Sequence, residues 1–363
     1  MSLTHLNVQL KKMEVDTAIV TLPSDIFYLT QFKTEPHERV VALVIQLERD
    51  PLLLLPAMEV EQARADGWAG DVLPYKDTDQ PWELLAASLD SATISTLGIQ
   101  KNHLTVERLE AIQQTLEPTK VIAVENVLQQ MRLVKSPQEL AIMKEAALFA
   151  DKGVEIGKHA LKEGITELEV KNAIEQGLAQ LGIAEMAFKT TVLFGKRSAQ
   201  PHGNSGNTAL CKGDIALFDL GVVHNGYTSD ITRCFLFAEY NEEAATIYEA
   251  VLAAEEQAIK SIAPGVPIAT AERAARDELK TRKLETDFTH RLGHGLGIDV
   301  HEFPSLHEKN ETPFCVGMTF TVEPGVYVPS IGGIRIEDDI VVTEHGYEIL
   351  TESPKQLEVV PYK

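Results

Sequence analysis

The dipeptide Asn225-Gly226, with a short apolar run on each side, constrains the fold of this chain more than any other feature. Asn-Gly between two strand-like segments is a strong local signal for a two-residue β-turn. The flanking segments, residues 215–220 and 229–235, are rich in Ile, Leu, Phe and Thr. The sequence therefore predicts an antiparallel hairpin around this turn.

The register of that hairpin brings two acids together. With Asn-Gly as the turn, Asp219 pairs with Thr232, and Asp230 lies on the same face as the diagonal neighbour of Asp219. Asp219 follows Leu217 and Phe218, and a carboxylate in an apolar strand is costly to bury unless it is paired or bound to a metal. The simpler alternative is that Asp219 lies at an edge and Asp230 is a solvated strand charge.

A second acidic strand pair follows downstream. Residues 318–323 and 334–342 read as strands joined through Gly332-Gly333, with Glu323 at the end of the first. The two-residue period of a strand places Arg335 and Glu337 on one face of the second. The alternative is that Glu337 begins a solvated acidic run.

Histidines supply the nitrogen donors. His294 lies in Gly293-His-Gly-Leu-Gly297, which lacks the spacing and the following helix of a dinucleotide-binding loop. We expect the flanking glycines to let the backbone approach a metal closely. His202 and His301 lie in Gly- and Pro-rich loops, where each taken alone would be a surface residue.

Composition narrows the class of protein. Lys and Arg number 33 against 54 Asp and Glu, and the net charge of -21 disfavours nucleic acid and anionic membranes as partners. The three cysteines are scattered, and we find no signal segment and no apolar run of membrane-spanning length. We expect a cytoplasmic protein that makes no membrane contact.

Residues 1–131 alternate short strands with helices and predict an α/β N-terminal domain. From about residue 132 the pattern changes to long helices between antiparallel hairpins. Ser136 and Thr166 begin capping boxes, which predict helix starts there. Residues 132–363 therefore form a C-terminal domain of the α+β class.

Together these segments resemble the pita-bread metallopeptidases, the family of methionine aminopeptidase, aminopeptidase P and prolidase, over nearly the whole chain. The resemblance implies a pita-bread catalytic domain behind a smaller creatinase-like domain. It also implies five metal ligands: Asp219, Asp230, His294, Glu323 and Glu337. In the proline-specific branch of the family, the substrate site is lined at the positions of His202, His290, His301 and Arg335.

The resemblance implies two divalent metal ions, with Mn²⁺ expected and Co²⁺, Zn²⁺ or Fe²⁺ as alternatives. A metal-bound hydroxide would attack the scissile carbonyl, and Glu323 or Glu337 would take the proton of the water from which it forms. His202 or His301 would then stabilise the oxyanion.

The loop at residues 32–39 resembles the loop of bacterial Xaa-Pro dipeptidases that reaches the site of a partner subunit. A homodimer is therefore expected, with His37 and Arg39 near the substrate. A cationic loop suits a dipeptide, whose proline carries a free carboxylate. The resemblance favours a dipeptidase of the prolidase type. The alternatives are an aminopeptidase P that acts on longer peptides and a metal-free pita-bread protein that only binds peptides.

Overall fold

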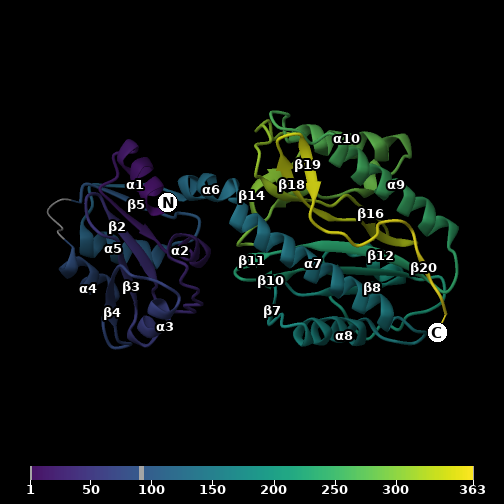
Figure 1. The fold of residues 1–363 in the computed structure, drawn as a ribbon, viewed down its shortest axis with the longest axis horizontal. Helices are drawn as coiled ribbons and strands as arrows, with labels where there is room; N and C mark the ends of the chain where they lie inside the picture. The colour runs from purple at the N-terminus through teal and green to yellow at the C-terminus, as the bar shows by residue number, and fades with distance from the viewer. Residues whose placement is uncertain (1, 90–93, 363) are drawn as a thin grey trace. The chain divides into compact units, whose positions relative to one another are not determined.

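The computed structural model describes residues 2–89 and 94–362. The chain divides into two compact units, one ending at Arg132 and one starting at Leu133. Figure 1 shows the helices and strands of each.

The described part of the first unit is built on a six-stranded sheet of order β4-β3-β2-β1-β5-β6. Its strands are β1 (Thr17–Val20), β2 (Ala42–Gln46), β3 (Leu52–Pro56), β4 (Asp71–Tyr75), β5 (Thr96–Ile99) and β6 (Lys120–Ala123). Its helices are α1 (Ser2–Lys12), α2 (Pro23–Thr30), α3 (Val60–Ala65), α4 (Pro81–Ser88), α5 (Val106–Leu116) and α6 (Glu125–Leu133). Parallel and antiparallel pairs both occur, as in a mixed α/β sheet.

The α/β pattern expected from residue 17 to residue 116 is confirmed by β1, β2, β3 and β5 and by helices α3 to α5. The sequence also predicts a strand over residues 93–99; Thr93 lies outside the described residues, and β5 forms the later part of the strand. The sequence did not predict β4 and β6, which form the two edges of the sheet. Pro74 interrupts β4, and proline is tolerated in edge strands because their outer backbone groups have no partner strand.

Four long helices support the second unit. They are α7 (Pro137–Ala160), α8 (Glu167–Gln180), α9 (Glu242–Lys260) and α10 (Ala269–Thr281). The predicted capping boxes are present: the side chains of Ser136 and Thr166 each accept a hydrogen bond from the backbone N–H three residues later, and the glutamate at that position accepts one from the backbone N–H of the cap residue. Each box satisfies backbone donors that a helix start leaves unpaired.

Antiparallel strands complete the second unit in its described part. A three-stranded sheet contains β7 (Glu185–Met186), β10 (Val222–His224) and β11 (Tyr227–Thr228). A four-stranded sheet contains β8 (Thr191–Phe194), β9 (Ile215–Leu220), β12 (Ile231–Phe237) and β20 (Val359–Val360). A five-stranded sheet contains β13 (Gly293–Gly295), β14 (Glu302–Leu306), β15 (Thr319–Val322), β18 (Asp338–Thr343) and β19 (Gly346–Ile349). The hairpin of β16 (Gly325–Val328) and β17 (Gly332–Arg335) lies beside them.

The predicted Asn-Gly hairpin is confirmed in register. His224 pairs with Tyr227 across the turn, and Asp219 pairs with Thr232. The prediction that Gly332-Gly333 joins two strands is wrong. Both glycines lie inside β17, which pairs with β16. The expected strand pair itself is present, because β15 pairs with β18. Neither glycine can be replaced easily, because a Cβ on Gly333 would collide with the carbonyl of Ser198.

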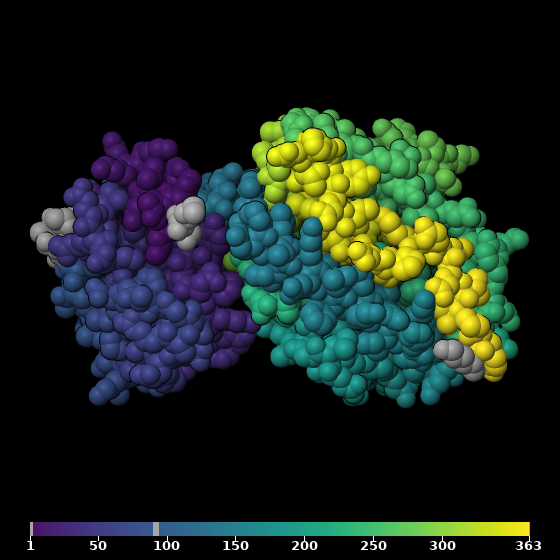
Figure 2. All heavy atoms as spheres, in the orientation of Figure 1, coloured from purple at the N-terminus to yellow at the C-terminus, as the bar shows by residue number. Residues whose placement is uncertain are grey.

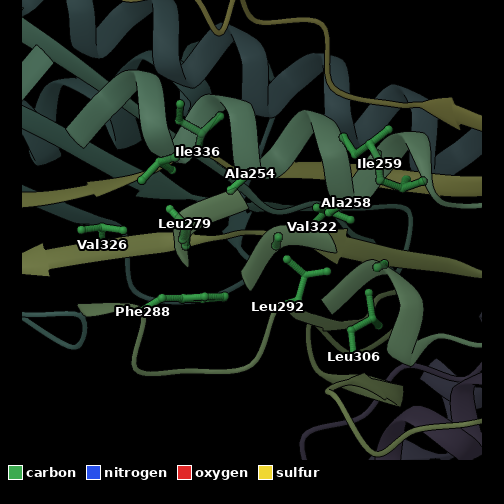
Figure 3. Close-up of a cluster of buried hydrophobic side chains, with 14 of the residues drawn as sticks. Ala254, Ala258, Ile259, Leu279, Phe288, Leu292, Leu306, Val322, Val326 and Ile336 are labelled. Atoms are coloured by element: carbon green, nitrogen blue, oxygen red, sulfur yellow. The ribbon is translucent and has the colours of Figure 1, made fainter. Parts of the chain in front are cut away.

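The β9–β12 sheet separates two hydrophobic cores. Phe218 and Phe235 point into the core beneath α7 and α8, whereas Leu217 and Cys234 point into the core beneath α9 and α10. In Figure 3, Ala254 and Ala258 of α9 lie among the side chains of this second core, near Val322. Asp219 shares its strand face with Leu217, so the strand period directs Asp219 toward the side of the second core.

The C-terminal segment lies across the surface of this unit and appears in yellow in Figure 2. Asp151 of α7 accepts hydrogen bonds from the backbone of Glu352 and Ser353, and β20 pairs with β12. No helix within residues 2–89 or 94–362 is both long and apolar enough to span a bilayer.

Candidate metal centre

The five predicted ligands line one cavity of about 620 Å³ in the second unit. Asp219 comes from β9, Asp230 directly precedes β12, and His294 is the middle residue of β13. Glu323 follows β15, and Glu337 directly precedes β18. Five separate strand positions thus direct donor groups into one space.

Three of the donors meet most closely. Ligand atoms of Asp230, His294 and Glu337 all lie within 4.8 Å of one another, and all three side chains are buried. His294 Nε2 is also 3.3 Å from Glu323 Oε1 and 3.7 Å from Asp230 Oδ2. A nitrogen donor among carboxylates suits a divalent metal of the first transition row.

Arg335 holds the fifth acid. Its Nη2 donates to Asp219 Oδ2, and its Nη1 donates to the Tyr327 hydroxyl at 2.9 Å. Its Nε donates to Thr232 Oγ1 at 3.0 Å, and Thr232 Oγ1 donates to Glu337 Oε2 at 2.5 Å. Arg335 therefore links Asp219 and Glu337, and all three of its nitrogens have protein partners.

The four carboxylates at the cavity influence one another's pKa values, as expected of a single cluster. Burial, together with the neighbouring carboxylates Glu337 and Asp219, raises the pKa of Asp230 well above its ordinary value. Burial also raises the pKa of Glu337 far above its usual range and that of Glu323 to about 7. For Asp219, burial raises the pKa and the Arg335 guanidinium partly offsets it. Positive charge placed among these groups would relieve both the repulsion and the burial cost.

Burial favours the neutral form of three histidines in the cavity, His290, His294 and His301. Burial lowers the pKa of His294 to about 3 and that of His290 to about 4. Burial also lowers the pKa of His301, whose ring lies edge-on to the His294 ring at a centroid distance of 4.2 Å. A neutral imidazole offers the lone pair that a metal requires.

The donor set fits divalent metal ions. Asp230 Oδ1 is buried and has no hydrogen-bond partner, although buried polar atoms are nearly always satisfied. The neighbouring buried carboxylates also lack enough cations to balance them, since Arg335 is the one buried cation in direct contact with the five residues in the described chain. Carboxylate and imidazole donors in this geometry are what a hard or borderline cation would use.

The glycines beside His294 serve a different purpose from the one expected. A Cβ on Gly293 would collide with the Thr321 carbonyl, and a Cβ on Gly295 would collide with the Phe303 carbonyl. The glycines thus allow the adjacent strands, rather than a metal, to approach the His294 backbone. The close strand packing fixes the imidazole because it leaves the backbone of β13 no room to move.

Four of the six predicted substrate-binding or catalytic residues outside the ligand set line the same cavity, and two do not. His202, His290, His301 and Arg335 all line it. His37 and Arg39 belong to the first unit, where Arg39 pairs with Asp77 at 2.9 Å and with Glu38 at 3.1 Å. The cavity is lined by residues of the second unit.

Sequence reasoning missed several residues of the site. Tyr327 bridges Arg335 and His290, whose Nε2 lies 3.0 Å from the Tyr327 hydroxyl. Arg291 and Phe188 also line the cavity. The strand period pointed to Arg335, but the partners of a buried guanidinium come from distant strands and leave no local pattern. The sequence did hold a signal for Arg291, because this cation directly follows His290 and lies three residues before His294.

Comparison with known proteins places the chain in a family. Residues 141–344 match the family model described as metallopeptidase family M24, and residues 3–134 match the creatinase/prolidase N-terminal domain. The chain belongs to metallopeptidase family M24. The M24 match alone spans more than half of the chain, and it contains all five predicted ligands. The predicted fold class, a creatinase-like domain followed by a pita-bread catalytic domain, is confirmed.

Proteins of known sequence or structure are similar to this chain over nearly its full length. A Bacillus subtilis (strain 168) protein is 45% identical over 350 residues, which cover 96% of each chain. The prolidase from Pyrococcus horikoshii OT3 superposes with a TM-score of 0.91 at 31% identity, covering 98% of this chain and 99% of the other. The Xaa-Pro dipeptidase from Bacillus anthracis superposes with a TM-score of 0.91 at 30% identity, covering 98% of both. The chain is therefore a metallopeptidase of the prolidase-like type.

Proposed function

We propose that this protein is an Xaa-Pro dipeptidase that uses two divalent metal ions. The observation that carries the proposal is the buried meeting of Asp230, His294 and Glu337 at one cavity, with Glu323 beside them. The likeness to prolidases and an Xaa-Pro dipeptidase over nearly the whole chain supports the substrate class.

The proposed ligands are the five residues of the cluster: Asp219, Asp230, His294, Glu323 and Glu337. Four carboxylates would balance the charge of two M²⁺ ions. Mn²⁺ is our first choice of metal, with Co²⁺, Zn²⁺ and Fe²⁺ as alternatives, since oxygen and imidazole donors accept each. Release of Asp219 from Arg335, or sharing of the carboxylate between them, would accompany loading.

When bound, the ions would lower the pKa of a water nucleophile and polarise the scissile carbonyl. Glu323 is the proposed general base, because its carboxylate lines the cavity 3.3 Å from His294 Nε2 and can accept a proton from the water there. His301, which burial keeps neutral, and His202 are the proposed donors to the developing oxyanion. Both donors line the cavity without belonging to the ligand set.

Substrate recognition would combine apolar and cationic groups. The proline ring of the substrate has no N–H to donate, so apolar contact with Phe188 and Val300 of the cavity wall is the proposed recognition. Arg335 already donates to three protein groups, so we assign it to positioning Asp219 and Tyr327 beside the substrate. Arg291 lines the cavity and can face the free carboxylate of a dipeptide, next to His290.

A partner subunit would complete the substrate site. We keep the proposal that the chain forms a homodimer in which His37 and Arg39 approach the site of the other subunit. Sedimentation at micromolar concentration tests this, and a monomer at all concentrations would refute it.

We further propose a cytoplasmic location and a functional domain boundary between residues 131 and 132. The two compact units divide one residue later, and Arg132 is held in the first of them by Asp25 at 2.8 Å.

Aminopeptidase P is the second candidate, because the X-Pro aminopeptidase of Thermotoga maritima MSB8 superposes with a TM-score of 0.87 at 27% identity. Hydrolysis of Ala-Pro and of Ala-Pro-Ala, each with and without added Mn²⁺, separates the two. We expect Mn²⁺-dependent cleavage with a higher kcat/KM for Ala-Pro. Preferred cleavage of the tripeptide would favour aminopeptidase P, and no cleavage of either would refute a proline-specific peptidase.

A further inference from the structure

One buried carboxylate, that of Glu167, hydrogen-bonds to both ends of the segment that carries His202, residues 194–206. Glu167, the first residue of α8, has a fully buried side chain. Its Oε1 accepts a hydrogen bond from the backbone of Phe194 at 3.0 Å, and its Oε2 accepts one from the backbone of Gly206 at 2.8 Å. These two residues are the ends of the segment that contains His202. One side chain therefore ties together the entry and the exit of the segment.

An arginine within the segment completes this contact. Arg197 Nε pairs with the Glu167 carboxylate at 2.9 Å, and Arg197 Nη2 donates to the Asn204 carbonyl at 2.6 Å. Asn204 is two residues from His202. The buried charge of Glu167 is thereby paired, and the pair reaches the backbone beside the histidine.

The segment that carries His290 is held in the same way by a different helix. Glu272 of α10 is buried, and its Oε2 accepts a hydrogen bond from the Leu292 backbone at 2.5 Å. Arg276, one helical turn later, pairs with Glu272 Oε1 at 2.6 Å. The Arg276 guanidinium donates to the carbonyl of His290 at 2.8 Å and to that of Phe288 at 3.1 Å. Figure 3 shows Phe288 and Leu292 on this stretch beside the core.

We propose that these two glutamate–arginine clamps, Glu167 with Arg197 and Glu272 with Arg276, are positioning devices for the two histidines of the substrate cavity. The inference rests on the proposed function of His202 and His290. Neither histidine belongs to the proposed ligand set, so no metal bond would hold either imidazole directly. Each segment is instead fixed by a buried carboxylate that accepts from its backbone N–H groups, two for Glu167 and one for Glu272, and by a paired guanidinium that donates to its carbonyls, one for Arg197 and two for Arg276.

The clamps act on separate segments, and this permits a crossed test. Glu167→Gln and Glu272→Gln would each be combined with His202→Ala and with His290→Ala in the Mn²⁺-loaded enzyme. We expect Glu167→Gln to lower kcat on Ala-Pro roughly tenfold in the wild-type background and in the His290→Ala background. In the His202→Ala background it should cost less than twofold. Glu272→Gln should show the mirror pattern.

A purely structural role would give a different result. If Glu167→Gln lowers kcat by the same factor in all backgrounds, the positioning inference is wrong. Glu278→Gln is the matched control, because Glu278 forms an i,i+4 pair with Arg282 on the same helix as Glu272 and has no bond to the His290 segment. This control should leave kcat unchanged in every background.

Amide hydrogen exchange gives a readout that does not depend on activity. In Glu167→Gln, we expect faster exchange in peptides covering residues 194–206 and unchanged exchange in residues 286–293. Glu272→Gln should reverse this distribution. Faster exchange across the whole second unit, or in neither segment, would overturn the clamps. Should a glutamate variant fail to fold, Arg197→Lys and Arg276→Lys test the same pairs, because lysine keeps the charge but lacks the guanidinium fork that contacts the glutamate and the backbone carbonyls together.

The roles of the histidines and the ordering of their segments can be tested independently. If His202→Ala and His290→Ala both retain wild-type kcat, the proposed roles of the histidines are wrong, and the exchange data alone decide whether the clamps order the segments.

Discussion

Removing the metal should make stability fall as the pH rises through neutrality. In the metal-free protein, burial raises the pKa of Glu323 to about 7 from its ordinary value of 4.5. The folded state then holds the Glu323 proton more tightly than the unfolded state does. Stability is therefore greatest below about pH 4.5 with respect to this group, and it declines as the pH rises toward and past 7.

The magnitude follows from the two pKa values. At about 1.4 kcal/mol per pH unit, the separation corresponds to roughly 3 kcal/mol by pH 8. The raised pKa values of Asp230 and Glu337 act in the same direction. Between pH 6 and pH 8 this group accounts for roughly 1.4 kcal/mol of the loss, because about one pH unit of the separation lies above pH 6, and for a domain of this size that is about 3 to 6 °C in Tm. Metal ions hold the carboxylates ionised in the folded state, so the loaded protein should lack this decline.

Calorimetry at pH 6 and pH 8 is the appropriate assay. Both tryptophans, Trp68 and Trp82, lie in the first unit, so their fluorescence would report that unit and not the metal centre. The control is Glu323→Gln, which removes the titrating group and should flatten the decline of the metal-free protein by about the calculated amount. A metal-free wild type whose Tm is equal at both pH values, or higher at pH 8, would refute the reasoning.

Four further predictions concern single residues. Glu337→Gln should abolish turnover and lower bound metal in elemental analysis, and normal activity with two bound ions would contradict the ligand assignment. His202→Ala should keep its metal and lose roughly 10²-fold in kcat, whereas stoichiometric metal loss would make His202 a ligand. Gly293→Ala should destabilise the fold by roughly 3 kcal/mol or more in denaturant unfolding, because its Cβ meets the Thr321 carbonyl, and an unchanged midpoint would show that β13 can shift. Arg39→Ala should lower kcat/KM for Ala-Pro roughly 10- to 100-fold and affect Ala-Pro-Ala much less, and equal losses would reduce the loop to a surface feature.

Short-range sequence patterns were sufficient to predict several elements of the fold. The Asn225-Gly226 turn determined the register that places Asp219 opposite Thr232, because a two-residue turn leaves one pairing that keeps both strand faces consistent. Capping boxes at Ser136 and Thr166 marked helix starts for the same kind of reason: their hydrogen bonds span three residues. The expected alternation of residues 334–337 also holds, with Ile334 and Ile336 in the core.

Contacts between residues that are distant in the sequence could not be predicted from sequence patterns. Gly332 and Gly333 looked like a turn, but they lie in β17 because the strand passes close to the Ser198 backbone, and only the tertiary fold brings these together. Glu167 is 35 positions before His202 in the sequence, and its capping position gave no hint that its carboxylate closes a loop. Pairing of Arg335 with Tyr327 and Asp219 likewise depends on three strands meeting.

The most direct test of the account is a titration of metal-free protein with Mn²⁺ in which bound metal and Ala-Pro hydrolysis are measured on the same samples. The account predicts that hydrolysis reaches its maximum when two ions are bound per chain, and that the metal-free protein is inactive. Full hydrolysis without bound metal, or a protein that binds two ions and leaves Ala-Pro uncleaved, would contradict it.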